Sequence, residues 1–386
     1  MRSFPKLLLT AAFALAGVAF VWAQAKAGEL TIYAIDTEGG QSTLFVSSAG
    51  GTLLFDTGFP GDRDAGRILD ALKDAGVQEI DYLVTSHYDG DHVGGMKAIS
   101  DHIPIHNFVD HGTRIPEGGQ LAGFQATYPE IYTKGKRLIA KPGDKLAVKG
   151  FDVLVVTSDG EVLKKPLPGA GKPNPACAAF KEKDEEPDEN IYSVGLLITL
   201  GKFRDINLGD FVWNAESKLM CPNNPIGTVD LYQTSHHGSE RSGSPTLVHA
   251  LHPLVALMNN GTTKGGMTEA MATIGSSPGL EDFWALHWSA PAGLEYNPAG
   301  RFIANPETPE ATANFILHPP PPQNTGARPR GTPPVVRAAG GAGRQGGGRG
   351  DHTPAYWIKV VAKANGEFTV TNPRNNFSKT YQGGRR

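Results

Sequence analysis

The stretch His87-Tyr88-Asp89-Gly90-Asp91-His92 is the part of this chain that decides its fold and its chemistry. It follows the apolar run Ile80-Asp81-Tyr82-Leu83-Val84-Thr85-Ser86, which predicts a short buried strand, and residues 96–101 can open a helix. A strand, an acidic loop and a helix in this order form a sharp turn that points several ligands at one place. Crowded carboxylates repel one another and are costly to bury unpaired, so the pattern favours a metal site over a solvated acidic turn.

The spacing of the loop excludes a calcium-binding EF-hand. If Asp89 were the first position of such a loop, the fifth and twelfth positions would be Val93 and Ser100, where carboxylates or equivalent oxygens are needed. The two imidazoles also suit a borderline transition metal better than they suit calcium.

The loop and three further motifs resemble the metallo-β-lactamase superfamily, whose loop reads His-x-His-x-Asp-His. Residues 41–58 resemble its opening strands and end in a structural Asp-Thr-Gly turn. Leu208-Gly209-Asp210 resembles its bridging-Asp motif, and Ser235-His236-His237-Gly238-Ser239 resembles a His-His-Gly-Ser motif. Asp89 replaces the usual second His of this loop. A loop with Asp at this position resembles that of the branch that contains the hydrolase domain of competence-type DNA-uptake proteins. The resemblance covers roughly residues 29–265.

The composition is that of an ordinary globular protein. The chain has 386 residues, of which 39% are hydrophobic and 19% are charged, so a sizeable core can form. The net charge of −3 gives no general attraction to nucleic acid or to an anionic membrane. We therefore expect a small-molecule or nucleotide-like substrate, and a nucleic-acid partner has no support from the charge. The sequence does not indicate an oligomeric state.

The N-terminus predicts a signal peptide over residues 1–25. Arg2 and Lys6 precede an apolar run over residues 7–21, and Ala23-Gln24-Ala25 gives a cleavage site with small residues. The run is short for a membrane span of about 20 residues, so we expect no stable membrane anchor, although a retained anchor is the alternative. The mature protein is then periplasmic or secreted, and a disulfide between its two cysteines, Cys177 and Cys221, suits that compartment.

The remaining chain divides into three parts. Residues 26–318 carry the hydrolase domain, with an inserted surface loop at residues 159–190. Residues 319–352 are rich in Pro, Gly and Arg and predict a disordered linker. Residues 353–386 contain a β-hairpin signal around Asn365-Gly366, and we expect the hairpin to dock on the main domain.

The mixture of strands and helices predicts an α+β fold, and the resemblance implies a four-layer αββα metallo-β-lactamase-like sandwich. Apolar and polar residues alternate over residues 30–36 and 42–47, as they do in strands. An amphipathic helix is expected over residues 65–75, and paired strands are expected over residues 194–200 and 203–208. Metal ligands at strand ends would then lie along one edge of the sandwich.

The motifs supply ligands for two divalent metal ions. His87 and Asp89 alternate and can reach the first metal, Asp91 and His92 face the second, and Asp210 can bridge the two. One of His236 and His237 can complete the second site, while the other contacts the substrate. The remaining first-site ligand is either Asp159 or His111. The other histidines, including His287 and His352, have no motif context and are expected at the surface or in packing.

An oxygen-rich ligand set shifts the preference from zinc towards manganese, and both ions remain candidates. Asp91, His236 and His237 are the predicted catalytic residues, and Asn260 and Lys264 are predicted to bind the substrate. The resemblance implies an exported hydrolase that uses a metal-bound hydroxide, acting on phosphodiesters. The alternatives are hydrolysis of a lactam, lactone or carboxylic ester, and a non-enzymatic binding protein on the same fold.

Overall fold

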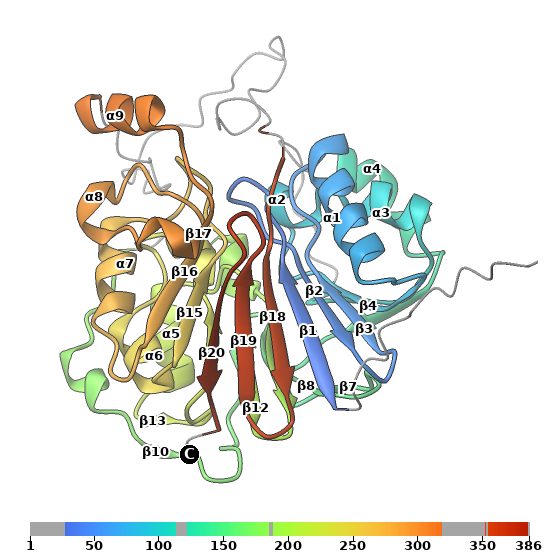
Figure 1. Cartoon of the computed structure of the whole chain (residues 1–386). Helices are drawn as coiled ribbons and strands as arrows, with labels where there is room; N and C mark the ends of the chain where they lie inside the picture. The colour runs from blue at the N-terminus through green and yellow to red at the C-terminus, as the bar shows by residue number, and fades with distance from the viewer. Residues whose placement is uncertain (1–27, 113–121, 185–187, 319–351, 353, 385–386) are drawn as a thin grey trace, which may run out of the picture.

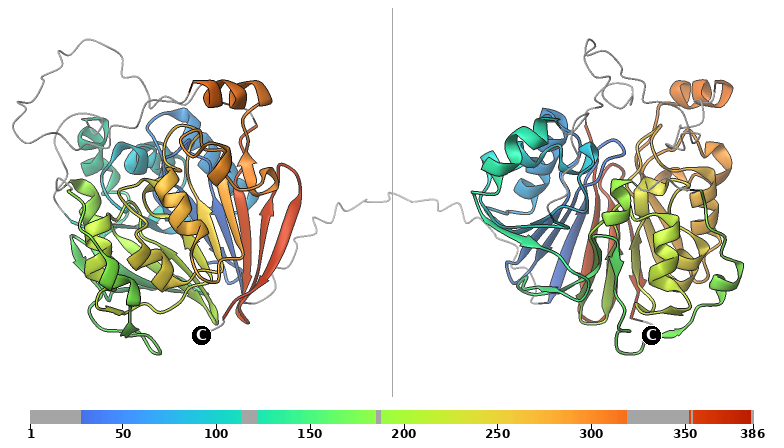
Figure 2. Two further views of the ribbon diagram at one scale, coloured as in Figure 1. Left: turned by 90° about the vertical axis from the view of Figure 1, so that its left-hand side faces the viewer. Right: turned by 180° about the vertical axis from the view of Figure 1, so that it is seen from behind.

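The computed structural model describes residues 28–112, 122–184, 188–318, 352 and 354–384. The predicted signal peptide and, apart from His352, the predicted linker lie outside the described residues. Two nine-stranded sheets face each other, and helices cover their outer faces (Figures 1 and 2). The predicted α+β sandwich with the layer order αββα is therefore confirmed. None of the described helices has the length and apolar character needed to cross a bilayer.

The first sheet contains the strands of the N-terminal part of the chain and those of its C-terminus. In spatial order its strands are β20 (Phe377–Gln382), β19 (Glu367–Asn372), β18 (Ile358–Lys363), β1 (Glu29–Ala34), β2 (Thr43–Ser47), β3 (Thr52–Phe55), β4 (Ile80–Val84), β5 (Ile105–Asp110) and β6 (Lys136–Ile139). Successive side chains point to opposite faces, so Leu44 packs under the helices while Phe45 packs between the sheets. Both faces of β2 and β3 are buried, which explains their nearly continuous apolar sequence.

The second sheet carries the later half of the metal motifs. In spatial order its strands are β17 (Ile303–Asn305), β16 (Asp282–His287), β15 (Val255–Met258), β14 (Leu231–Gln233), β12 (Phe203–Asn207), β11 (Gly195–Leu200), β8 (Asp152–Ser158) and β7 (Lys145–Leu146), with β9 (Glu161–Val162) beside β8. The strands β11 and β12 pair, as predicted, and they run antiparallel. The strands β12, β14, β15 and β16 run parallel, so their carboxyl ends lie at the same edge.

The helices lie outside the two sheets. They are α1 (Asp62–Asp74), α2 (Gly90–Val93), α3 (Met96–His102), α4 (Ala122–Ile131), α5 (Trp213–Met220), α6 (Pro245–Leu251), α7 (Thr268–Gly275), α8 (Gly293–Tyr296) and α9 (Pro309–Leu317). The predicted amphipathic helix is α1, whose Ala65, Ile68 and Leu72 pack against the first sheet. Short 3-10 turns are η2 (Pro175–Ala179), η3 (Glu189–Tyr192), η4 (Ser235–Gly238) and η5 (Gly300–Phe302).

The C-terminal strands extend the first sheet at its β1 edge. The strand β18 pairs antiparallel with β1, so that Ile32 lies opposite Val360 (Figure 1). The predicted hairpin strands correspond to β18 and β19, and β20 adds a third strand that the sequence analysis did not anticipate. Tyr381 of β20 accepts a 2.9 Å hydrogen bond from the indole of Trp284 in the other sheet. Tyr381 is therefore part of the core between the sheets.

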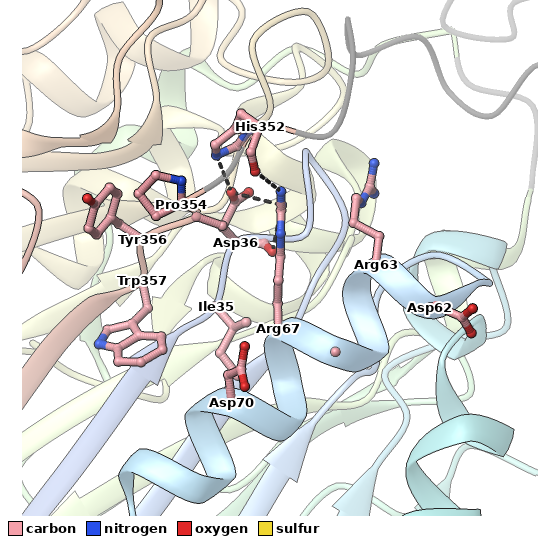
Figure 3. Close-up of a pocket in the computed structure, with 12 residues that line it drawn as sticks. Ile35, Asp36, Asp62, Arg63, Arg67, Asp70, His352, Pro354, Tyr356 and Trp357 are labelled. Carbon is pink, nitrogen blue, oxygen red and sulfur yellow. Dashed lines mark hydrogen bonds and ion pairs between the residues drawn. The ribbon is translucent and has the colours of Figure 1, made fainter.

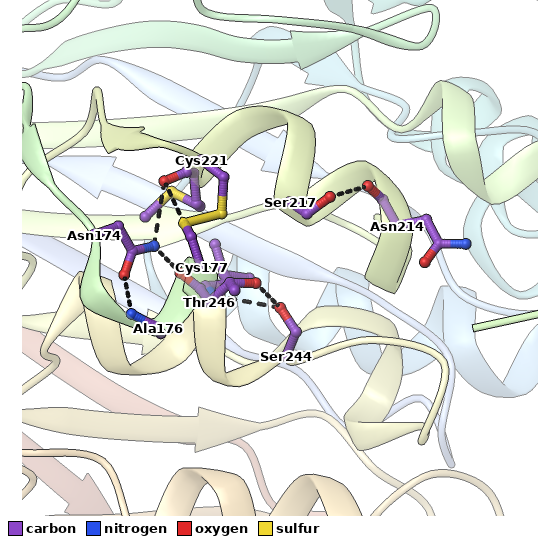
Figure 4. The surroundings of a disulfide bond; sticks show 10 residues. Asn174, Ala176, Cys177, Asn214, Ser217, Cys221, Ser244 and Thr246 are labelled. Atoms are coloured by element: carbon purple, nitrogen blue, oxygen red, sulfur yellow. Dashed lines mark hydrogen bonds between the residues drawn. A yellow bond between two sulfur atoms is a disulfide. The ribbon is translucent and has the colours of Figure 1, made fainter. Parts of the chain in front are cut away.

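The region predicted as an inserted surface loop is fastened to the second sheet. It contains β10 (Lys172–Pro173), which pairs with β13 (Asn223–Asn224). The structure joins Cys177 to Cys221 by a disulfide, with the two Cα atoms 5.8 Å apart (Figure 4). The side chain of Asn174 donates hydrogen bonds to backbone carbonyls on the neighbouring elements. The disulfide also excludes Cys221 from metal binding.

Candidate metal centre

Three strand ends bring the motif residues to one edge of the sandwich. The strand β4 lies between the parallel neighbours β3 and β5 and leads into His87, after which Asp89 precedes α2. On the second sheet, β12 leads to Asp210, and the parallel strand β14 leads to the turn with His236 and His237. Because the carboxyl ends of parallel strands meet at one edge, side chains that are far apart in the sequence converge there.

Asp210 lies at the centre of the group, because all four motif imidazoles approach one of its oxygens. From Asp210 Oδ2 the distances are 4.0 Å to His87 Nε2, 3.3 Å to His92 Nε2, 3.5 Å to His236 Nε2 and 3.3 Å to His237 Nε2. The bridging role predicted for Asp210 requires a central place of this kind. Both members of the His-His pair face Asp210, whereas the sequence analysis expected only one of them to be a ligand.

The two loop carboxylates divide the group into two sides. Asp89 Oδ2 lies 3.5 Å from His87 Nε2, and the Asp89 side chain is 44% exposed. Asp91 Oδ2 lies 3.5 Å from His92 Nε2 and 3.3 Å from His237 Nε2, and its side chain is only 11% exposed. One side of the centre is thus open to solvent through Asp89, while the Asp91 side is buried.

The donor atoms of this group have the character expected of metal ligands. His87 Nε2, His92 Nε2, His237 Nε2 and Asp210 Oδ1 are buried and make no hydrogen bond. A buried polar atom left without a partner costs about 1–3 kcal/mol, so four at one place need an explanation. One donor atom from each of Asp91, His92, Asp210 and His237 lies within 4.8 Å of all the others. The residues present therefore fit a metal ion, which would satisfy these atoms together.

A hydrogen-bonded layer behind the ligands orients the imidazoles of the loop. His92 Nδ1 lies 2.7 Å from Asp56 Oδ2. Asp56 also accepts hydrogen bonds from the backbone N–H and the hydroxyl of Ser86, and Ser86 Oγ lies 2.9 Å from His87 Nδ1. A carboxylate that binds Nδ1–H leaves Nε2 free for a metal, which is the usual arrangement behind metal-binding histidines. The structural Asp-Thr-Gly turn thus acts through His92.

The His-His pair has its own support. His236 Nδ1 lies 3.2 Å from Ser242 Oγ, and His237 Nδ1 lies 3.1 Å from the side-chain amide of Asn259. His236 and His237 have φ values of 53° and 55°, in the left-handed region that L residues rarely adopt. Two consecutive residues in this conformation turn both imidazoles towards Asp210, and such strained residues concentrate at functional sites.

Gly94 and Gly95, which follow the loop, let the chain pass close to the Asp-Thr-Gly turn. A Cβ at Gly94 would lie 2.1 Å from Pro60 N, and a Cβ at Gly95 would lie 2.3 Å from Thr57 O. Both distances are far below van der Waals contact, so any other residue would force the two segments apart. The glycines therefore fix the distance between Asp56 and the loop ligand His92.

Neighbouring positive charges lower the pKa values of the buried carboxyl groups at the centre. Burial would raise the pKa of Asp210, but the nearby charges of His237 and His92 hold this pKa well below its ordinary value. Burial would likewise raise the pKa of Asp91, but Lys264 and the imidazoles hold it well below its ordinary value. Burial lowers the pKa of His236 to about 4, so that imidazole is neutral and can act as a ligand. The carboxylates are ionised, which a ligand must be.

The structure places Asp159 and His111 outside this group. His111 Nε2 lies 2.7 Å from Glu189 Oε1, and Glu189 also accepts a hydrogen bond from the backbone N–H of Tyr88. Asp159 is exposed, has a φ of 49°, and lines a surface pocket together with Lys141. Neither prediction for the remaining first-site ligand is supported by these contacts. The fourth imidazole at Asp210 comes instead from the His-His pair.

The two predicted substrate-binding residues differ in their surroundings. Lys264 Nζ contacts Asp91 Oδ2, so its ammonium group lies beside a metal ligand, and its side chain is 35% exposed. Asn260 is fully buried, and its amide donates to the carbonyls of Gly261 and His287. The amide of Asn260 fixes the loop to β16, so its contacts give no support to a role in substrate binding.

A second group of acidic and histidine side chains was missed by the sequence analysis. Asp36, Glu38, His287 and His352 each place a donor atom within 4.8 Å of the other three. His287 and His352 were expected at the surface or in packing because no motif surrounds them. The four residues come from three separate stretches of the chain, so no local spacing could have indicated the group.

Comparisons with known proteins agree with the fold. Residues 36–173 match the family model of the metallo-beta-lactamase superfamily. The chain is 27% identical to competence protein ComA of Neisseria gonorrhoeae over 219 residues, which are 57% of this chain and 25% of that protein. It is 29% identical to metallo-beta-lactamase domain-containing protein 1 of Rattus norvegicus over 137 residues, 33% of this chain and 53% of that protein. The match thus spans a quarter of the first relative and about half of the second.

Among solved structures, the metallo-beta-lactamase fold protein YhfI from Bacillus subtilis superposes with a TM-score of 0.43 and 11% identity. The superposition covers 67% of this chain and 96% of YhfI. The family match over residues 36–173 and the clustered motif residues are consistent with each other. Residues 36–173 therefore match the metallo-beta-lactamase superfamily that the sequence motifs resemble.

Proposed function

We propose that this protein is a metal-dependent hydrolase of phosphodiesters. The superfamily consists mostly of metal-dependent hydrolases, and the described His/Asp group can hold a metal ion. The observation that carries the phosphodiester assignment is Lys264, whose ammonium group contacts Asp91 at the partly exposed rim of the centre. A fixed cation beside the ligands favours a substrate that brings a negative charge there, as a phosphodiester does.

Two divalent ions, zinc or manganese, would be held on the two sides of Asp210. His87, Asp89 and His236 would hold one ion, Asp91, His92 and His237 would hold the other, and Asp210 would contact both. Three carboxylates favour manganese and four imidazoles favour zinc, so this donor set suits both metals. Bound ions would acidify water and polarise a phosphoryl oxygen.

In this proposal the Lys264 ammonium group has two partners, Asp91 in the free protein and a phosphate oxygen in the substrate complex. Lys264 Nζ lies 5.0 Å from the centre of the Phe59 ring, and the Arg63 guanidinium carbon lies 5.8 Å from the same ring. The aromatic face holds the Lys264 stem near the rim, so its ammonium can turn from Asp91 to a non-bridging phosphate oxygen. Lys264 then binds and orients the substrate while Asp91 remains free to act as a ligand.

A substrate panel with a matched lysine variant tests this proposal. Metal-reconstituted protein should hydrolyse bis-p-nitrophenyl phosphate faster than nitrocefin or p-nitrophenyl acetate. Lys264→Met should raise the KM for the diester by about tenfold or more, the size expected for a charge-assisted hydrogen bond, with little effect on a neutral ester. Lys97→Met is the control, because Lys97 has a 41% exposed side chain whose ammonium group pairs with Asp101. Faster turnover of nitrocefin or of the acetate ester would contradict the phosphodiester assignment.

We also propose that the protein is exported to the periplasm or secreted. The support is the N-terminal sequence together with the Cys177–Cys221 disulfide, since disulfides form and persist in oxidising compartments. N-terminal sequencing of the mature protein should give a start near Lys26. A protein that keeps residues 1–25 and is recovered from the cytoplasm would contradict export.

A further inference from the structure

A second group of potential metal ligands lies at the same end of the sandwich, and the proposed hydrolysis uses none of them. We term it the outer cluster, and its members are Asp36, Glu38, His287 and His352. Asp36 and Glu38 lie in the loop after β1, His287 is the last residue of β16, and His352 precedes β18. The outer cluster thus connects the first sheet, the second sheet and the segment that leads into the C-terminal strands.

Every imidazole in the outer cluster faces a carboxylate. His287 Nε2 lies 2.7 Å from Asp36 Oδ1 and 3.8 Å from Glu38 Oε2. His352 Nδ1 lies 2.6 Å from Glu38 Oε1, and its Nε2 lies 3.1 Å from Asp36 Oδ2 (Figure 3 shows Asp36 and His352). The two imidazole rings meet edge to face, with centroids 5.3 Å apart. One donor atom from each of the four residues thus lies within 4.8 Å of the other three.

We propose that the outer cluster is a second metal site, which binds one divalent transition-metal ion, with zinc as the expected occupant. Two imidazoles and two carboxylates form a donor set that zinc accepts in tetrahedral coordination. Bonds of about 2.0–2.1 Å in that geometry place donor atoms about 3.3 Å apart. The contacts of His287 Nε2 and His352 Nε2 with Asp36, at 2.7 and 3.1 Å, need to widen by less than an ångström, which side-chain rotation can supply.

The orientation of both imidazoles supports this assignment. His287 is only 2% exposed, and its Nδ1 lies 3.5 Å from the hydroxyl of Thr262, which in turn donates to Glu307 at 2.5 Å. A polar group on the far nitrogen is what holds a metal-binding imidazole in place. His352 Nε2 is a buried atom that makes no hydrogen bond, although it lies near Asp36. An ion at this point would satisfy that nitrogen.

Arg67 is compatible with an ion in the outer cluster. Its Nη1 lies 2.9 Å from Asp36 Oδ2 and 3.2 Å from Glu38 Oε1, and its Nη2 donates to the backbone carbonyl of His352 (Figure 3). A carboxylate has about four lone-pair positions, so Asp36 and Glu38 can each contact Arg67 and an ion. With neutral imidazoles, Arg67 leaves one of the two carboxylate charges uncompensated. A divalent ion and a proton on an imidazole therefore compete for the same place.

The outer cluster can be reached from solvent. Asp36, Arg67 and His352 line a pocket of about 540 Å³ whose opposite wall includes Tyr356 and Trp357 (Figure 3). An entry path of this kind is one of the features a real metal site needs. The pocket also places the site beside the first residues of the C-terminal strands, so a bound ion would fasten that segment to the loop after β1.

Zinc stoichiometry in full-length protein with a disabled metal centre tests the proposal. In Asp91→Ala/Asp210→Ala protein, stripped with a chelator and titrated with zinc, we expect about one equivalent above any ion left at the damaged centre. Adding His352→Gln should remove that equivalent, because glutamine keeps a hydrogen-bonding side chain but is a poor zinc ligand. His106→Ala is the control, since His106 is an exposed histidine that pairs with Glu79 at 3.0 Å.

Circular dichroism and cobalt(II) absorption distinguish loss of the metal site from loss of folding. The His352 side chain is 34% exposed, so its replacement should leave the circular dichroism spectrum unchanged. Cobalt(II) added to the disabled protein should give visible absorption bands that disappear in His352→Gln and in His287→Ala. Equal zinc content with and without His352→Gln, in folded protein, would show that the outer cluster is only an ion-pair network. This outcome is independent of the phosphodiester proposal, because no turnover is measured.

Discussion

Two buried carboxylates five residues apart show what separates a metal ligand from a structural acid. Asp205 lies within β12 and is fully buried, and Oδ2 accepts a 2.7 Å hydrogen bond from the Gln233 amide. Burial raises the pKa of Asp205 to about 7. Asp210 lies just beyond the same strand and is buried to almost the same degree, yet the charges of the surrounding imidazoles hold its pKa well below the ordinary value. Burial alone favours a protonated acid, and converging imidazoles keep the charge that a metal needs.

The largest effect that follows from this contrast is expected for Asp210→Asn. The amide cannot supply the charge that both sides of the centre share, so both ions should be lost, and phosphodiester turnover should fall by about a thousandfold or more. Metal analysis and turnover of bis-p-nitrophenyl phosphate measure the two losses. Asp205→Asn is the matched control and should keep its metal. If both variants retained full metal content, Asp210 would not be a ligand.

A smaller loss of metal affinity is expected for Asp56→Asn, because Asp56 supports a ligand and does not itself bind the metal. Asp56 binds His92 Nδ1 and the Ser86 hydroxyl, so it acts on the metal through the orientation of His92. Replacing such a supporting carboxylate costs about 10–100-fold in metal affinity. Competition of the protein with a chromophoric chelator measures the dissociation constant. Unchanged affinity would mean that the His92 imidazole is held by its packing alone.

Asp205→Asn should itself change how stability depends on pH. The pKa of Asp205 is raised in the folded state, so the stability it contributes is fully present below its unfolded pKa of about 3.9 and is lost as the pH rises through about 7. Between pH 5 and pH 8, the free energy of unfolding of the wild-type protein should therefore fall by on the order of 1–3 kcal/mol more than that of the variant. Thermal unfolding of both proteins at a series of pH values gives the difference, and identical slopes would contradict the raised pKa.

The parts of the centre that the sequence predicted are those in which adjacent residues act together. His87 to His92 and the His236–His237 pair each lie on one short turn, so their spacing in the chain reflects their spacing in space. The layer order of the sheets was predictable only through the family resemblance, since composition and periodicity give the mixed class alone. The outer cluster lay beyond reach, because Asp36 and His287 are brought together only by the packing of two sheets.

The prediction of Asp159 or His111 as the remaining first-site ligand rested on a position that other members of the superfamily fill. The structure instead directs His236, which has a left-handed φ, towards Asp210. A positive φ at a histidine cannot be read from a sequence, because glycine and asparagine are the residues that usually signal it. The backbone conformation therefore directs the His236 imidazole towards Asp210, which the order of ligands in the sequence could not predict.

The smallest and most selective change concerns Asp89, a third carboxylate that differs from both Asp205 and Asp210. Its side chain is 44% exposed, and its oxygen lies 3.5 Å from His87 Nε2 on the open side of the centre. Burial would raise the pKa of Asp89, but the hydrogen bond and charge of His87 lower it, so the carboxylate is ionised. Asp89→His restores the loop pattern usual in the superfamily and replaces a hard oxygen donor by an imidazole nitrogen.

Since imidazole suits zinc and carboxylate suits harder ions, Asp89→His should increase the retention of zinc relative to manganese, by about tenfold or less. The change removes one negative charge from the centre, and imidazole places its donor atom differently from a carboxylate, so turnover can fall while zinc retention rises. The zinc-to-manganese preference must therefore be measured by direct competition, with turnover recorded separately. Asp101→His, at an exposed carboxylate paired with Lys97, controls for the added imidazole. An unchanged preference in Asp89→His would show that Asp89 is not a metal ligand, and the open side of the centre would then be held by His87, His236 and Asp210 alone.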